Sequence, residues 1–134
     1  MTARERPLVL LVEDYEDTLD ILTEGMTAEG FDVATATSGY EAIDKATELL
    51  PDIVLMDLSL PEMDGWEATR RLKADPRTRD ICIVALTAHA LDSHAERASE
   101  VGCDAFVTKP FLLDQLIHEV RRLLSQRATE AERG

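Results

Sequence analysis

Charged and hydroxyl side chains follow several short apolar runs of this sequence, at the points where those runs end. Glu13 and Asp14 follow the first run, Asp57 follows the third, Thr87 follows the fourth, and Lys109 comes just after the fifth. A single acid in such a place is weak evidence, since Asp is also a common helix N-cap, and Asp14 alone fits either role. Agreement among four runs favours one shared site.

The residue types in this set point to phosphoryl transfer. Three carboxylates held together repel, so each makes ionisation of the others more costly. A hard divalent cation such as Mg²⁺ relieves that cost, because it prefers oxygen ligands. One carboxylate remains free to act as a nucleophile, and carboxylates are known covalent phosphate acceptors. Lys109 and Thr87 supply a positive charge and a movable donor for the phosphoryl oxygens.

Five short, mostly apolar runs predict the β-strands that would position these residues. They span residues 7–12, 31–36, 52–56, 81–86 and 105–108. The first, third and fourth are continuous apolar runs, and the other two are weaker. Continuous runs of this length are typical of strands that are covered on both faces, as in a parallel sheet.

Amphipathic patterns between and after these runs predict helices. The first pattern is a stripe formed by Leu19, Leu22 and Met26. The second begins at Ser38, which has capping-box spacing to Glu41. The remaining patterns span 65–74, 92–102 and 113–124. Each apolar stripe is expected to face the core.

The alternation of strand and helix gives five (βα) units. Because crossovers between parallel strands are right-handed, these units predict an α/β fold, a doubly wound five-stranded parallel sheet with helices on both faces. In such sheets the active crevice lies outside the carboxyl ends of the strands. The candidate site residues are placed at those ends.

Length and composition are those of one acidic domain. The chain has 134 residues and a net charge of −13, from 27 acids and 14 bases. Nucleic acids and anionic membranes are polyanions and therefore unsuitable direct partners, and no apolar run predicts a signal peptide or a spanning helix. We expect one domain over 7–125, short flexible tails at 1–6 and 126–134, and no output domain.

The two cysteines, Cys82 and Cys103, lie in or beside apolar stretches. They form no CxxC pair and have no histidine nearby at ligand spacing. This pattern favours buried reduced thiols over a disulfide or a metal site, and it predicts a cytoplasmic protein.

Four stretches, LVEDYED, VLMDLSLPEMDGWE, VALTAHA and GCDAFVTKPF, together with the (βα)₅ order, resemble the receiver domains of bacterial response regulators, the CheY-like superfamily. The resemblance covers about residues 8–124. It implies the flavodoxin-like strand order 2-1-3-4-5. It also implies that Asp57 is the phosphoacceptor.

The resemblance implies a Mg²⁺ site at the acidic cluster. Asp14 matches the direct metal ligand, and Glu13 matches the acid that holds the metal mainly through water. Asp57 and the backbone carbonyl of Ser59 would complete the protein ligands. Glu13 stands where Asp is frequent in the family, and its extra methylene is expected to alter the metal geometry slightly.

Further roles follow from the same resemblance. Lys109 would pair with Asp57 and then with the phosphoryl oxygens, and the Lys109–Pro110 bond matches one that is usually cis. Thr87 would swing toward the phosphoryl group. Phe106 matches the aromatic switch position, without the hydroxyl of the Tyr often found there.

Two positions near the phosphoryl group are expected to influence its lifetime. Ser59 and His89 each lie two residues beyond a site residue, Asp57 and Thr87 respectively. His89 would order the attacking water or shield the acyl phosphate. An ordinary exposed loop histidine remains an equal reading of that position.

The leading hypothesis is a single-domain response regulator. A histidine kinase or phosphotransfer protein would phosphorylate Asp57, with Mg²⁺ bound. The signal would pass by protein contact at the helix 4–strand 5–helix 5 face or by onward relay. Such a protein is no enzyme apart from self-phosphorylation by phosphodonors and slow autodephosphorylation.

Two alternatives belong to other classes. A Mg²⁺-dependent phosphohydrolase with an aspartyl phosphate, of the haloacid-dehalogenase type, needs a second Asp two residues after the nucleophile, where Ser59 stands. A phosphorylation-independent docking module would fit a chain that had lost the acidic or lysine positions, which this chain retains.

Overall fold

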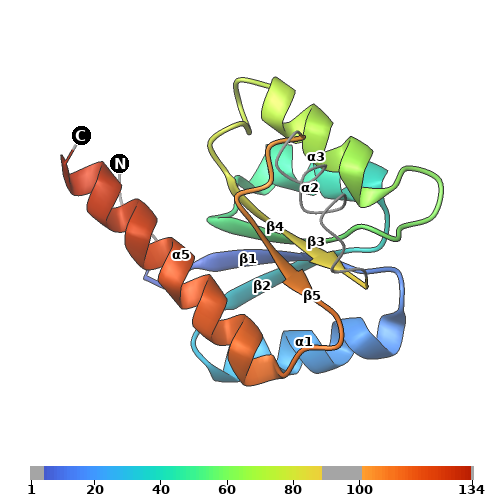
Figure 1. The fold of residues 1–134 in the computed structure, drawn as a ribbon, viewed down its shortest axis with the longest axis horizontal. Coiled ribbons are helices and arrows are strands. Elements are labelled where there is room, and N and C mark those ends of the chain that lie inside the picture. The colour runs from blue at the N-terminus through green and yellow to red at the C-terminus, as the bar shows by residue number, and fades with distance from the viewer. Residues whose placement is uncertain (1–4, 89–100, 134) are drawn as a thin grey trace.

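The computed structural model describes residues 5–88 and 101–133, with side chains as far as Arg127 (Figure 1). The elements in chain order are β1 (Leu8–Val12), α1 (Glu16–Ala28), β2 (Asp32–Ala36), α2 (Gly39–Leu49), β3 (Ile53–Asp57), α3 (Gly65–Ala74), β4 (Cys82–Thr87), β5 (Ala105–Thr108) and α5 (Leu113–Arg133). The ends of all five predicted strands agree with the structure to within one residue.

The strands form one parallel sheet in the order β2-β1-β3-β4-β5, which confirms the predicted doubly wound topology. In the register of β1 and β3, Val12 lies opposite Met56. The residues that follow, Glu13 and Asp57, therefore emerge side by side at the carboxyl edge. The Glu13 amide still donates to the carbonyl of Ala36 at 3.0 Å, so the backbone of Glu13 is held by the sheet.

Helices cover both faces of the sheet, with α1 and α5 on one face and α2 and α3 on the other (Figure 1). Successive strand residues point to opposite faces, so β1 contributes to two cores. Val9 and Leu11 pack with the apolar residues of α1 and α5. Leu10 and Val12 pack with those of α2 and α3. A strand buried on both faces explains why its sequence is continuously apolar.

Side-chain caps determine where α2 and α3 begin. Ser38 Oγ accepts from the Glu41 amide at 3.1 Å, as the capping-box spacing predicts. Glu41 Oε1 accepts in return from the amide of Thr37 at 2.7 Å, one residue earlier than in the usual box. Asp64 Oδ1 caps α3 by accepting from the Glu67 amide at 2.9 Å.

The C-terminal segment differs from its prediction. The residues expected to form a flexible tail, 126–134, continue α5 as far as Arg133, and α5 projects beyond the sheet (Figure 1). The reason is local, because Ser125–Arg133 contains good helix formers and neither glycine nor proline. A polar sequence after the last core residue does not by itself end a helix.

The helix predicted at 92–102 lies mostly outside the described residues. Val101 is helical, and Gly102 follows with a φ of +96°, a left-handed conformation that suits a glycine after a helix. No helix within 5–88 or 101–133 is both long and apolar enough to cross a membrane.

Candidate functional site

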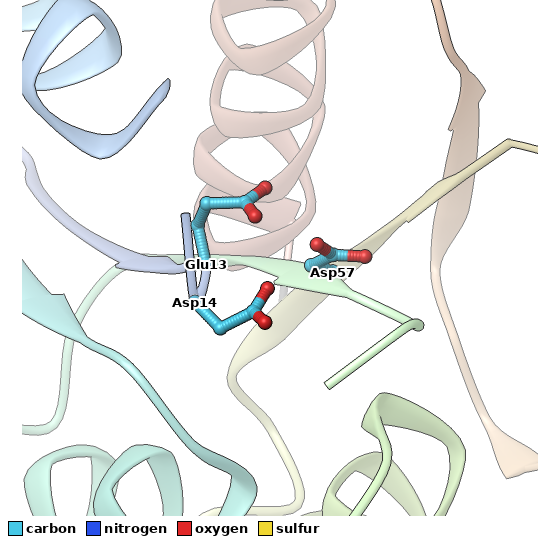
Figure 2. A group of neighbouring side chains, drawn as sticks. All are labelled: Glu13, Asp14 and Asp57. Atoms are coloured by element: carbon cyan, nitrogen blue, oxygen red, sulfur yellow. The ribbon is translucent and has the colours of Figure 1, made fainter. Parts of the chain in front are cut away.

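Three carboxylates meet at the carboxyl edge of the sheet, beyond the ends of β1 and β3 (Figure 2). Glu13, Asp14 and Asp57 each place one carboxylate oxygen within 4.8 Å of the other two. Glu13 and Asp57 are buried, with 4% and 3% of their surfaces exposed, whereas Asp14 is exposed. The structure therefore brings together the three acids that the sequence places at the ends of two strands.

Lys109 provides the positive charge of the site. Its Nζ lies 3.2 Å from Glu13 Oε2 and 3.2 Å from Asp57 Oδ2, so one ammonium bridges the two buried carboxylates. Burial works against the charged form of Lys109, but the Asp57 and Glu13 carboxylates outweigh it and raise its pKa above the ordinary value. The lysine is therefore charged at neutral pH.

The surroundings of Glu13 raise the pKa of its carboxyl group above the ordinary value. Burial raises its pKa, and the nearby Asp57 carboxylate raises it further. The Tyr15 amide donates to Glu13 Oε1 at 3.2 Å and, with Lys109, lowers the pKa in part. The charged form of Glu13 is thus less favourable than that of a surface acid.

Backbone groups orient the phosphoacceptor candidate. Asp57 is the last residue of β3, and its Oδ1 accepts from the Ser59 amide at 2.9 Å. The Ser59 residue itself is exposed. With Lys109 at Oδ2, both oxygens of Asp57 have a donor, and the side chain is fixed in place.

The two predicted switch residues lie on neighbouring strands. Thr87 ends β4 with 5% of its surface exposed, and its carbonyl accepts from the Lys109 amide at 2.6 Å. Phe106 lies on β5 opposite Ala85 and is 44% exposed. The Lys109–Pro110 bond is cis, as the resemblance implies. His89 lies outside the described residues.

Both cysteines carry free thiols. Burial raises the pKa of Cys82 and of Cys103 to about 11. Extension of the β4–β5 register would place the two residues side by side, but their side chains pack in different core clusters. The expectation of buried thiols holds for Cys82, whereas Cys103 is only partly buried.

The donor set fits a hard divalent cation. It consists of carboxylate oxygens within 4.8 Å of one another, and three negative charges face one ammonium. The excess of negative charge would be relieved by Mg²⁺, which prefers oxygen ligands. The backbone donors of Tyr15 and Ser59 complete the site. Nothing in the sequence pointed to these two donors, because every residue except proline has a backbone amide and the residue type does not show which amides face the site.

A doubly wound parallel sheet with clustered acids and a lysine at its carboxyl edge is typical of receiver domains. The family model for the response regulator receiver domain matches residues 9–121, and the chain belongs to this family. One curated relative is the polar-differentiation response regulator DivK of Brucella ovis. It is 37% identical over 116 residues, which cover 87% of this chain and 94% of the relative.

Solved receiver structures show the same fold. The receiver domain of the sensor histidine kinase PA1611 from Pseudomonas aeruginosa is 31% identical with a TM-score of 0.83, over 90% of this chain and 98% of that one. That structure has a magnesium ion coordinated in its active site cleft. The chemotaxis protein CheY4 of Vibrio cholerae is 25% identical with a TM-score of 0.83, over 87% and 98% of the two chains.

Proposed function

We propose that Asp57 accepts a phosphoryl group from a phosphohistidine of a kinase or phosphotransfer protein, and that this chain signals as a single-domain response regulator. One observation carries the proposal. Asp57 is buried at the end of a rigid strand, with a lysine ammonium 3.2 Å from its Oδ2 and two further acids beside it. The proposal places the protein in the cytoplasm, where histidine kinases phosphorylate their regulators.

Mg²⁺ is the metal that the site would hold. Asp14, Asp57 and the backbone carbonyl of Ser59 would be direct ligands, and Glu13 would contribute mainly through water. When bound, Mg²⁺ supplies positive charge that neutralises the phosphoryl oxygens in the transition state. The magnesium ion in the related PA1611 receiver domain supports this assignment.

The residues of the chain have separate roles in the transfer. An oxygen of Asp57 forms a bond to phosphorus while the phosphorus–nitrogen bond of the phosphohistidine breaks, and that electron pair stays on the imidazole. Lys109 moves from the Asp57 carboxylate to the phosphoryl oxygens and stabilises their charge. Because the strand end already holds Asp57 in place, little conformational entropy is lost when the phosphohistidine protein binds.

The signal is proposed to leave through the helix 4–strand 5–helix 5 face, which combines the helix predicted at 92–102 with β5 and α5; most of that helix lies outside the described residues. The Thr87 hydroxyl would turn toward the phosphoryl group, and Phe106, 44% exposed, would repack with it. Such a change would shift the equilibrium between two conformations of this surface, and a partner protein would bind one of them in preference. Ser59 and His89 are proposed to border the phosphoryl group and set its lifetime.

Intact mass tests the proposal. The chain is mixed with acetyl phosphate and Mg²⁺, beside Asp57→Asn and beside Asp44→Asn, which changes an exposed acid on α2 in the same way. We expect one added phosphoryl group in the wild type and in Asp44→Asn, and none in Asp57→Asn. Equal uptake by Asp57→Asn would place the acceptor elsewhere. No uptake by any variant, from acetyl phosphate or from a phosphohistidine protein, would overturn the proposal.

A further inference from the structure

The loop between β3 and α3, residues 58–64, is held at its far end by a glycine. A Cβ on Gly65 would lie 2.3 Å from the Asp57 carbonyl oxygen and 2.8 Å from the Leu58 Cα. The Gly65 amide also donates to the Leu58 carbonyl at 3.3 Å. The loop therefore closes back on the strand end, and it can do so because Gly65 has no side chain.

A second glycine, on another element, holds the middle of the same loop. A Cβ on Gly39, the first residue of α2, would lie 2.5 Å from the Met63 carbonyl oxygen and 3.0 Å from the Met63 Cβ and Cγ. The nearest obstacle is backbone, which cannot rotate away as a side-chain end can. Met63 is 4% exposed and packs in the same core cluster as Ala42 and Ala46 of α2.

At this contact the loop is expected to move more easily than α2. Helix α2 is capped by Ser38, and the fully buried Ala42 and Ala46 anchor it in the core. The loop instead contains Glu62 with a φ of 63°, a left-handed conformation that is unfavourable for a residue with a Cβ. A methyl group added at Gly39 would therefore displace the loop before it displaces the helix.

We infer that Gly39 is a positioning residue for the phosphoacceptor site. The close approach of Gly39 to Met63 determines where the loop lies. The loop in turn places the Ser59 amide, which donates to Asp57 Oδ1 at 2.9 Å, and the Ser59 carbonyl. This inference rests on the proposed function, because the Ser59 carbonyl is a metal ligand only in that proposal. Gly39 acts on the site from a helix that carries none of the three acids.

Two measurements on Gly39→Ala test the inference. Calorimetric titration with Mg²⁺ gives the dissociation constant, and the ¹H–¹⁵N spectrum without metal reports the Ser59 amide. Glu48→Gly is the matched control, because it weakens the same helix at an exposed position away from the loop. We expect Gly39→Ala to bind Mg²⁺ about tenfold more weakly than wild type and to shift the Ser59 amide resonance. Glu48→Gly should leave both unchanged.

The outcomes separate the inference from the proposed function. A wild-type chain that binds no Mg²⁺ would overturn the metal assignment and the inference with it. A wild type that binds Mg²⁺, with Gly39→Ala unchanged in both measurements, would overturn the inference alone. Should Gly39→Ala not fold, Met63→Ala removes the buried loop side chain from the other side of the contact. Met63→Ala should then weaken Mg²⁺ binding, and an unchanged dissociation constant would overturn the inference.

Discussion

At the scale of single residues, the site holds more buried negative than positive charge. This imbalance suits the binding of a cation but lowers the stability of the metal-free chain. Two buried carboxylates, Glu13 and Asp57, share one ammonium, and each is held within 3.2 Å of Lys109. One positive charge cannot fully compensate two buried negative charges. The raised pKa of Glu13, caused first by burial and then by Asp57, reflects this deficit. A site that must take up a cation is incompletely neutralised without it.

Glu13→Gln is expected to stabilise the metal-free chain at pH 7, by about 0.5–2 kcal/mol. The pKa of Glu13 is raised on folding above the ordinary value of 4.5, so its ionised form destabilises the fold at neutral pH. Below that ordinary value the glutamate is protonated in both folded and unfolded states and resembles glutamine. The advantage of Glu13→Gln should therefore shrink as the pH falls from 7 toward 4.5.

Urea denaturation of both proteins across this pH range, without divalent metal, measures the difference. Asp44→Asn, an exposed acid on α2, serves as the control. An advantage that stays constant or grows as the pH falls would contradict the prediction, because it would come from something other than the ionisation of Glu13.

At the scale of elements, α1 relies on other parts of the chain at its C-terminal end. The helix contains no basic residue, although cations are favourable near its last carbonyls. Arg6 donates to the carbonyls of Thr27 and Phe31 at 3.0 and 3.1 Å. Arg121 of α5 donates to the Glu29 carbonyl at 3.0 Å, and its guanidinium lies 5.7 Å from the centre of the Phe31 ring.

Arg121→Ala is expected to lower the free energy of unfolding by about 1 kcal/mol, because it removes two hydrogen bonds to Glu29, one of them an exposed ion pair with its carboxylate, together with a helix-end charge and a cation–π contact. Urea denaturation measures the loss, which should shrink at high salt. Arg122→Ala is the matched control, since Arg122 pairs only with Glu119 on the same helix among the interactions described. Equal losses in the two variants would show that α5 does not support the end of α1.

At the scale of the whole molecule, one lysine joins three segments at the amino edge of the sheet. Lys73 of α3 donates to the Ile81 carbonyl at 2.7 Å, to the Arg79 carbonyl at 3.1 Å and to Asp104 Oδ2 at 2.9 Å. Asp104 Oδ2 also accepts from the Ile83 amide at 2.8 Å. The Lys73 side chain is only 17% exposed. It therefore ties α3 to the N-terminal ends of β4 and β5, at the edge of the sheet opposite the three acids.

Lys73→Met is expected to destabilise the chain by about 1–3 kcal/mol, because it leaves the partly buried Asp104 carboxylate and two carbonyls without their shared donor. Urea denaturation measures the loss. Lys45→Met is the control, since Lys45 donates to the single carbonyl of Thr35 among the described contacts. A loss for Lys73→Met no larger than that for Lys45→Met would show that the three-way contact adds little.

Much of the fold was predictable because its signals are local. Apolar runs placed all five strands to within a residue, and the three continuous runs became β1, β3 and β4, which are covered on both faces and need apolar side chains at nearly every position. The Ser38 cap followed from spacing alone. The helix at 126–133 was missed although its signal is also local, because the prediction followed the apolar stripe rather than helix propensity. Helix propensity continues through Arg133 although the apolar stripe ends at Leu124.

The sequence by itself determined the residue types of the site and the strand ends that carry them, because both depend on the order of residues along the chain. Tertiary structure alone decided how these groups interact. Lys109 bridges Glu13 and Asp57, which are 96 and 52 positions away, and Gly39 at the start of α2 contacts Met63 of the β3–α3 loop. Strand register and the burial of neighbouring elements set these distances and the raised pKa of Glu13. Such quantities depend on the whole chain, and no local pattern encodes them.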